Sequence, residues 1–292
     1  MTAIQSVPDL PAELTDAIID HLHDDKPTLS KCSLVCNSWL DSSRYHLFHT
    51  IRVRGEHKTK NFAAFLAFIN DTPHIRRYIQ GVIFRFTGAL AARSADIRRV
   101  GPYTLSFILE TLPGIRSIVL DNISWDRTLT AGPDGRAVSS WPITPPKELD
   151  TFTFSRVVTG DLRVFCVNDV RELLASFSFI RVLNILSMTL ELDVGGPDVP
   201  IFPEHLQLEE MNVNSNYSRL PDAPMLDAIH QSMKRSLRRL SVACRNDEEA
   251  MVIGSILRII GPALEELRLD HSDMMALRAF SKSCVPAVAV LS

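Results

Sequence analysis

Few cysteines, no long apolar run and little net charge are the first features of this sequence. Its 292 residues contain five cysteines, an odd number spread from Cys32 to Cys284. A disulfide framework is therefore not expected, and a reducing intracellular compartment, cytoplasmic or nuclear, is the simpler interpretation. No stretch approaches the roughly 18 consecutive apolar residues of a membrane-spanning helix, and no basic stretch followed by an apolar run opens the chain. We predict neither a transmembrane helix nor a signal peptide, and no membrane as a partner.

Signatures of catalysis and cofactor binding are also missing. The sequence has no phosphate-binding glycine loop, no dinucleotide fingerprint, no Gly-x-Ser-x-Gly and no His-Glu-x-x-His. Cys32 and Cys36 lie four residues apart, but zinc needs four converging ligands, and small thiols are ordinary on an apolar helix face. We therefore expect no metal, no cofactor and no enzyme. An enzyme would need a convergent polar pocket in the later part of the chain.

Charge is nearly balanced overall but unevenly distributed. The net charge is −3, which gives no reason to expect nucleic acid as the main partner. Residues 1–50 carry seven acids and three bases, a net −4, whereas residues 51–100 carry ten bases and three acids, a net +7. This change of sign predicts a module boundary near residue 50.

The first module is expected to be a unit of three short helices. Leu14, Ile18 and Leu22 recur at the helical period, and Pro11 suits a first helical turn, so the first helix is expected over residues 11–23. A second helix is predicted after Pro27, and a third over residues 37–48, broken or bent near Asn37-Ser38. Three short helices also occur in helix-turn-helix proteins, but the net −4 argues against DNA binding, because phosphate contacts need Lys and Arg.

An ordered set of short motifs in this module carries a family resemblance. In chain order they are Leu10-Pro11, Glu13-Leu14, Ile18 with Leu22, Leu34-Val35-Cys36, Trp39, Leu47-Phe48 and Ile51. Over some 42 residues, about one seventh of the chain, this set resembles the F-box, particularly the form common in large fungal families. No single motif would suffice, because Leu-Pro-x-Glu is frequent by chance.

The resemblance implies a partner and a role. F-box proteins bind a Skp-type adaptor, which links them to a cullin, and they act as substrate receptors of a ubiquitin ligase that hold an unknown protein target. The adaptor face is carried onto Leu10, Pro11, Leu14, Ile18, Leu22, Leu34, Val35 and Trp39. For Leu14 and Val35 a place in the module's own core remains an open alternative. A non-ligase interaction scaffold with an F-box-like module is the alternative function.

A repeating apolar pattern follows residue 50. Each occurrence has apolar residues at its first, fourth and sixth positions. The start-to-start spacings of the occurrences are 36, 34, 31, 28, 29 and 27 residues. The last four are close to the spacing of leucine-rich repeats. The seven occurrences are Ile79/Val82/Phe84, Ile115/Ile118/Leu120, Leu149/Phe152/Phe154, Ile180/Leu183/Ile185, Leu208/Met211/Val213, Leu237/Leu240/Val242 and Leu264/Leu267/Leu269.

Helical patterns precede most of these strand-like runs. They cover Phe62–Ile69, Thr104–Leu112, Val170–Phe177, Pro224–Met233 and Glu248–Ile260. Alternating helices and strands predict an α/β fold in which residues 51–292 form an irregular leucine-rich-repeat-like solenoid, with short parallel strands and outer helices. The Asn or Cys that follows the strand in regular repeats is clear only at Asn122, so a compact α/β domain with one parallel sheet remains the alternative.

Three further features complete the sequence-based expectations. Residues 126–147 are rich in Pro, Gly and Ser and are expected to form a loop insertion, whose Trp141 either packs on the sheet or is exposed for recognition. The apolar C-terminal tail either packs back on the fold or continues into further chain.

Basic residues could form a face for an acidic or phosphorylated target, or simply a solvated surface. They are Arg52, Arg54, Lys58, Lys60, Arg76, Arg77, Arg98, Arg99, Lys234, Arg235, Arg238 and Arg239.

Overall fold

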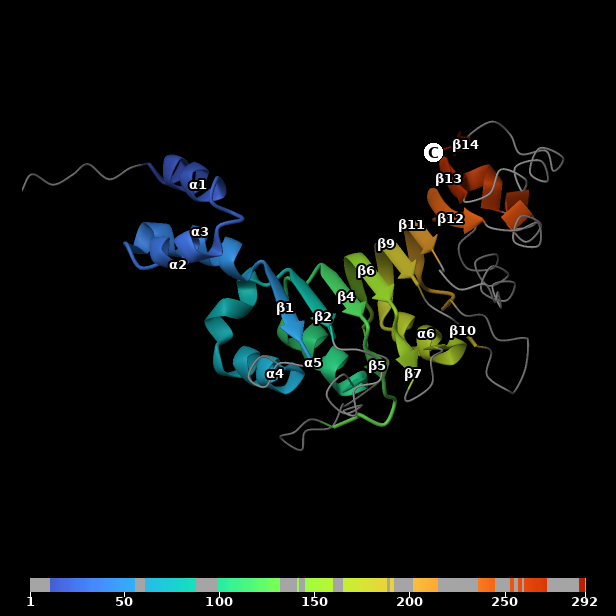
Figure 1. Cartoon of the computed structure of the whole chain (residues 1–292), viewed down its shortest axis with the longest axis horizontal. Coiled ribbons are helices and arrows are strands. Elements are labelled where there is room, and N and C mark those ends of the chain that lie inside the picture. Colours follow the sequence, from blue (N-terminus) through green and yellow to red (C-terminus); the bar gives the residue numbers. More distant parts are fainter. Residues whose placement is uncertain are drawn as a thin grey trace, which may run out of the picture.

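The chain folds into a helical module followed by a parallel β-sheet (Figure 1). The computed structural model describes residues 11–55, 61–87, 99–131, 141, 145–159, 165–187, 190–191, 202–214, 236–244, 253–254, 257–258, 260–271 and 289–291. The predicted α/β class with parallel strands is confirmed. None of the helices in these ranges has the length and apolar character needed to cross a membrane.

Three helices form the module at the beginning of the chain. They are α1 (Ala12–Asp20), α2 (Lys26–Cys32) and α3 (Asn37–Phe48). All three were predicted, but α1 ends three residues before the expected position, and α3 is continuous from Asn37 instead of broken there. Cys36 directly before α3 has an extended backbone, with φ −161° and ψ 170°. The change of direction therefore lies in the turn before the helix and not within it.

The main sheet has nine strands, hydrogen-bonded in the order β1-β2-β4-β6-β9-β11-β12-β13-β14. Every neighbouring pair is parallel, and the spatial order follows the chain order (Figure 1). In that order the strands cover Thr50–Arg54, Gly81–Arg85, Ser117–Asp121, Lys147–Ser155, Phe177–Leu186, Gln207–Asn214, Arg239–Cys244, Glu266–His271 and Ala289–Leu291. Within the apolar tail, residues 289–291 pack back on the sheet, because β14 pairs with β13.

The predicted repeat coincides with the register of this sheet. Each of the seven predicted runs supplies one strand, and their middle apolar positions are cross-strand partners, in the order Val82, Ile118, Phe152, Leu183, Met211, Leu240 and Leu267. These seven side chains are at most 3% exposed. The alternate side chains point to the opposite face of the sheet, as the period of two requires. There they are mostly half-buried.

Helices cover the apolar face in the first part of the sheet. They are α4 (Phe62–Asp71), α5 (Pro102–Thr111) and α6 (Val167–Leu174), together with the short 3₁₀ helix η1 (Pro73–Tyr78). Another short 3₁₀ helix, η3 (Gly261–Ala263), precedes β13 near the other end of the sheet. Helix α4 begins where Asn61 Oδ1 accepts the Ala64 N–H at 2.8 Å, a typical N-cap. The predictions for α4 and α5 are confirmed. The prediction for α6 was displaced by three residues, because Phe177 opens strand β9.

Short strands, which were not predicted, accompany the predicted outer helices. Strands β3 (Arg99–Val100), β5 (Ser124–Trp125) and β7 (Val158–Thr159) form a second parallel sheet, and β8 (Phe165–Cys166) pairs with β10 (Leu190–Glu191). The described residues of the expected 126–147 loop contain no helix, and β6 begins at Lys147. The predicted helix Pro224–Met233 and most of Glu248–Ile260 lie outside the described residues.

The same turn follows three successive strands. Asn122, Arg156 and Ser187 stand directly after β4, β6 and β9, with φ angles of 55°, 53° and 52°. The amide of each donates to the last residue of the next strand, as Asn122 N does to Ser155 O at 2.8 Å. Asn122 is buried, and its Nδ2 also donates to Phe86 O at 2.6 Å. Asn tolerates the left-handed conformation better than other non-glycine residues, which accounts for its position here.

Candidate protein-interaction surfaces

Helix α1 has one buried and one exposed side. Thr15 and Ile19 point inward and are buried, whereas Leu14 and Ile18 are 53% and 43% exposed. Leu14 and Ile18 are four residues apart and therefore lie on the same side of the helix. Pro11, one turn earlier, is exposed as well. The three form an apolar stripe that is exposed to solvent.

Polar contacts fix α1 against α3. Ser42 Oγ of α3 donates to Asp16 Oδ1, and His46 Nε2 lies 2.7 Å from Asp20 Oδ1. Asp16 and Asp20 are each two residues from the stripe, about 200° around the helix from it. These contacts therefore bind the side of α1 opposite the stripe to α3, and the stripe stays exposed.

The start of α2 is fixed by a capping carboxylate. Asp25 accepts the Thr28 N–H at 3.1 Å and the Thr28 hydroxyl at 2.6 Å. These two hydrogen bonds hold the pKa of Asp25 below its usual value. Pro27 stands in the first turn, where its missing N–H costs nothing. The helix ends at Cys32, so Leu34 and Val35 fall in the turn that leads to α3.

A small core holds the module together. Ile19, Leu29 and Cys32 are buried in it. Leu22, Trp39 and Leu47 pack against them and are partly buried. A core of this size gives limited stability by itself, so the module depends on its neighbours.

All large exposed apolar side chains of the described residues lie in this module. They are Leu34 (85%), Val35 (63%), Leu14 (53%), Ile18 (43%) and Tyr45 (38%). Four of the five belong to the predicted adaptor face, so these four are not core residues. Concentrated exposed apolar side chains mark an interaction surface in soluble proteins. We call Pro11, Leu14, Ile18, Leu34 and Val35 the apolar surface of the module.

The remaining predicted contact residues are placed differently. Leu22 and Trp39 are partly buried against the core of the module, so any contact they make with a partner uses only part of their surface. Leu10 lies outside the described residues. Their role in adaptor binding stays a prediction.

Asp41 attaches the module to η1, which leads into strand β2 of the sheet. Tyr78 Oη donates to Asp41 Oδ1 at 2.5 Å, and Arg77 Nη2 donates to the same oxygen at 3.0 Å. The hydrogen bond from Tyr78, more than the charge of Arg77, holds the pKa of Asp41 below its usual value. His49 O also accepts the amides of Gln80 and Gly81 at 2.9 and 2.8 Å. Side-chain and main-chain bonds thus orient the module relative to the sheet.

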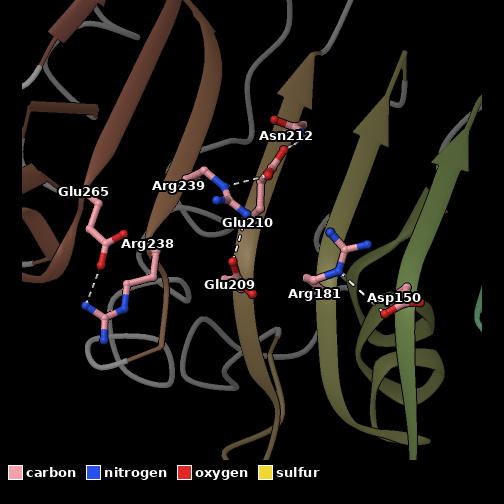
Figure 2. A network of polar contacts seen from close by, with 8 residues as sticks. All are labelled: Asp150, Arg181, Glu209, Glu210, Asn212, Arg238, Arg239 and Glu265. Atoms are coloured by element: carbon pink, nitrogen blue, oxygen red, sulfur yellow. Dashed lines mark hydrogen bonds and ion pairs between the residues drawn. The ribbon is translucent and has the colours of Figure 1, made fainter.

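The open face of the sheet carries a chain of polar side chains. Asn184 Nδ2 donates to Thr153 Oγ1 at 2.9 Å, and Asn212 Nδ2 donates to Asn184 Oδ1 at 2.8 Å and to Glu210 Oε1 at 3.0 Å. Arg239 Nε donates to Glu210 Oε2 at 2.8 Å (Figure 2). Burial raises the pKa of Glu210, but the bonds from Asn212 and Arg239 and the charge of Arg239 outweigh it and leave the pKa lowered.

Charges alternate in sign across the sheet at the second position of the repeat. Figure 2 shows part of this row, with Arg238 and Glu265 3.0 Å apart and Arg181 3.6 Å from Asp150. Opposite charges on neighbouring strands stabilise the pairing, and like charges would not. The whole row is Arg116, Asp150, Arg181, Glu209, Arg238 and Glu265. This row was not predicted, although the second position of the predicted repeat contains the signal.

One carboxylate is buried at the carboxyl end of the strands. Asp121, at the end of β4, has a side chain only 5% exposed. Its Oδ2 accepts from Arg85 Nε at 2.6 Å, and its Oδ1 accepts from Arg156 Nη2 at 2.7 Å. Two arginines thus compensate the buried charge, as burial of a carboxylate requires.

Four of the seven described residues of the predicted basic face are paired with carboxylates. Arg77 pairs with Asp41, Arg99 with Asp126, and Arg238 and Arg239 with glutamates. Arg76 donates to the carbonyls of Ile69 and Asn70. Arg52 and Arg54 have no ion pair among the described residues. Lys58, Lys60, Arg98, Lys234 and Arg235 lie outside those residues.

Trp141 packs inward, which decides between the two roles considered for it. It is partly buried against the core, with its ring centroid 6.0 Å from that of the buried Trp125.

Cys32 is buried and Cys36 is exposed, and neither forms a disulfide. Within the part of the chain that the structure describes, no group of three or more His, Cys, Asp or Glu side chains could hold a metal ion.

Comparison with known proteins adds no assignment. No protein-family model matches the chain, and no curated protein matches its sequence.

Proposed function

We propose that this chain is a substrate-receptor subunit of a Skp-cullin-F-box ubiquitin ligase. The observation that carries the proposal is the apolar surface of the module. Leu14, Ile18, Leu34 and Val35 were assigned to an adaptor from the F-box resemblance alone, and all four are exposed. A partner protein recognises spaced apolar side chains of this kind when they insert into a groove on its surface.

We further propose that residues 51–292 are an irregular leucine-rich-repeat-like solenoid that holds the target. Strands in chain order, parallel pairing and the recurring left-handed turn support this interpretation. A solenoid of this kind presents one long open face, and the polar row through Asn184 and Asn212 lies on that face. Loops and open faces are common places for recognition residues.

The mechanism follows from proximity. A receptor that holds the target beside a ubiquitin-charged enzyme raises the effective concentration of target lysines at that enzyme. The receptor need not contribute a covalent step, a metal or a cofactor to this mechanism. Its two requirements are an adaptor contact and a target contact that can be occupied together.

Adaptor binding tests the proposal directly. The full chain should retain a purified Skp-type adaptor in a pull-down, and Leu34→Ala/Val35→Ala should weaken this binding by at least ten-fold, as expected for anchors worth about 1.4 kcal/mol or more. Because both side chains are exposed, the variant should keep its fold, which circular dichroism would check. Tyr45→Ala is the matched control, since it removes an exposed ring of the same module outside the predicted adaptor set.

Each outcome has a definite meaning. Adaptor binding that depends on Leu34 and Val35, together with co-purification of a cullin, supports the ligase role. Adaptor binding without a cullin favours the non-ligase scaffold. Failure of the folded wild-type chain to bind the adaptor overturns the ligase role and leaves a repeat-type interaction protein of unknown partner.

A further inference from the structure

Strand β1 is an edge strand with unpaired backbone groups. It is the first strand of the sheet and pairs only with β2 among the described strands. His49 O accepts from Gly81 N, and Gly55 N donates to Arg85 O, so the odd-numbered residues point their backbone groups toward β2. In a strand the next residues point the opposite way. The backbone groups of Thr50, Arg52 and Arg54 therefore face away from the sheet.

A broad groove of about 1480 Å³ lies along this edge. Thr50–Val53 of β1 form one wall, and Ala64, Phe65 and Phe68 of α4 line a second, apolar part. The helical module closes the end of the groove with residues of α3 and of the turn after α1. The groove thus combines unpaired backbone groups with an apolar floor, which is the arrangement that binds an added strand in other sheets.

Two arginines without an ion pair among the described residues stand on this edge strand. Asp20 and Asp24 also line the groove, where Asp20 lies 2.7 Å from His46 and Asp24 lies 3.0 Å from His23. Arg52 and Arg54 are exposed and have no ion pair within the described ranges. Arg54 is also the cross-strand partner of Arg85, and like charges in this position are unfavourable. The uncompensated arginines favour an acidic ligand.

Lys26 also lines the groove, close to both Asp24 and Arg52. Burial lowers the pKa of its ammonium group, the charge of Asp24 raises it, and the charge of Arg52 lowers it, with a lowered pKa as the result. Its Nζ donates to the carbonyl oxygen of His46, which fixes it at the groove.

We propose that the free edge of β1 binds an extended acidic segment of a partner protein, which adds to the sheet as a further strand. Its main chain pairs with the outward backbone groups of Thr50, Arg52 and Arg54. Side chains alternate between the two faces of a strand. One set of ligand side chains therefore lies beside Arg52 and Arg54 and is acidic, and the other faces the apolar wall of α4. This goes beyond the proposed ligase role and does not depend on adaptor binding, because β1 is separate from the apolar surface of the module.

A short labelled peptide provides the test. The probe is an eight-residue peptide in which Glu and Val alternate, and its binding to the full chain is measured by fluorescence anisotropy. A Lys–Val peptide and a Glu–Val peptide with two valines replaced by proline are the control ligands. We expect the Glu–Val peptide to bind, the Lys–Val peptide not to bind, and the proline peptide to lose at least ten-fold in affinity, because proline lacks an N–H.

Charge reversal distinguishes this edge from general electrostatic attraction. Arg52→Glu/Arg54→Glu should weaken Glu–Val binding at least ten-fold and create binding of the Lys–Val peptide. Arg171→Glu/Arg258→Glu is the matched control, because it makes the same change of charge at exposed positions elsewhere, and it should leave binding unchanged. In NMR exchange experiments the amides of residues 50, 52 and 54 should slow on binding. Those of residues 51 and 53, already bonded to β2, should change little.

Three results would overturn the proposal. One is binding without slower exchange at residues 50, 52 and 54, which would indicate a charged patch and no added strand. The second is the absence of binding by every peptide. The third is an Arg52→Thr/Arg54→Thr variant that self-associates while the wild type binds no peptide, which would mean that the arginines only keep a free edge from pairing with itself.

Discussion

Asp121 is the residue whose replacement should most destabilise the carboxyl end of the strands. Its carboxylate is buried and accepts hydrogen bonds from Arg85 and Arg156, whose side chains are 52% and 56% exposed. Asp121→Ala removes both contacts and leaves two arginines without their partner. We expect the free energy of unfolding to fall by roughly 2–4 kcal/mol, toward the lower end because the arginines can reach water. Urea unfolding followed by circular dichroism would measure it.

Asp150 supplies the control for this substitution. It pairs with Arg116 and Arg181 at 3.7 and 3.6 Å, but its side chain is 42% exposed. Asp150→Ala should therefore cost less than about 1 kcal/mol. Equal losses for the two variants would show that burial of Asp121 contributes nothing.

At this scale the sequence could predict burial more easily than function. The repeat correctly identified buried positions such as Phe152 and Leu183, because apolar spacing reports directly on the core. It could not choose between core and surface for Leu14 and Val35, since helical spacing shows which residues share a side but not what covers that side. Asp121 was missed because its partners, Arg85 and Arg156, are 36 and 35 residues away.

The N-cap of α2 should make the stability of this helix depend on pH. The pKa of Asp25 is lowered in the fold by its bonds to Thr28, so its contribution is present above the unfolded value of about 4. That contribution is lost as the pH falls through the lower folded pKa. We expect the amides at the start of α2 to lose protection in hydrogen exchange between pH 7 and pH 3, after correction for the intrinsic exchange rate.

Two substitutions at Asp25 separate the hydrogen bond from the charge. Asp25→Asn keeps a cap without a titrating group, so its protection should change less with pH. Asp25→Ala should show low protection at both pH values. If the wild type and Asp25→Asn respond alike to acid, the titration of another group controls α2.

Among the elements, the strands were predicted better than the outer row. All seven predicted runs became strands, because their apolar residues lie on one face and must be buried together. Strand β1 was missed, since Ile51 had been attributed to the end of the helical module. The outer row was expected to be helical, but two-residue strands such as β3 and β5 need too little sequence to leave a periodic pattern.

The stability of the molecule should be distributed unevenly between its two parts. Three residues, Ile19, Leu29 and Cys32, are buried in the core of the helical module, whereas β6 and β9 are bonded on both sides within the sheet. Local opening requires little free energy where few apolar contacts are lost. We expect amides of α1–α3 to exchange faster than those of β6 and β9 in hydrogen-exchange mass spectrometry.

Addition of the adaptor extends this measurement. If the adaptor binds the apolar surface of the module, exchange in α1–α3 should slow while exchange in β6 and β9 stays the same, because binding stabilises the folded module. Uniform exchange throughout the free chain would contradict the difference in stability. It would mean that the module and the sheet open as a single unit.

The chain order of the strands also governs how the protein is made. From β2 onward, each described strand of the main sheet pairs with the strand that was synthesised just before it. Each of these strands therefore finds its first partner already synthesised. Contacts of this kind close short loops, which favours early folding. The helical module emerges before the sheet, so its apolar surface is available to a partner while the strands are still being translated.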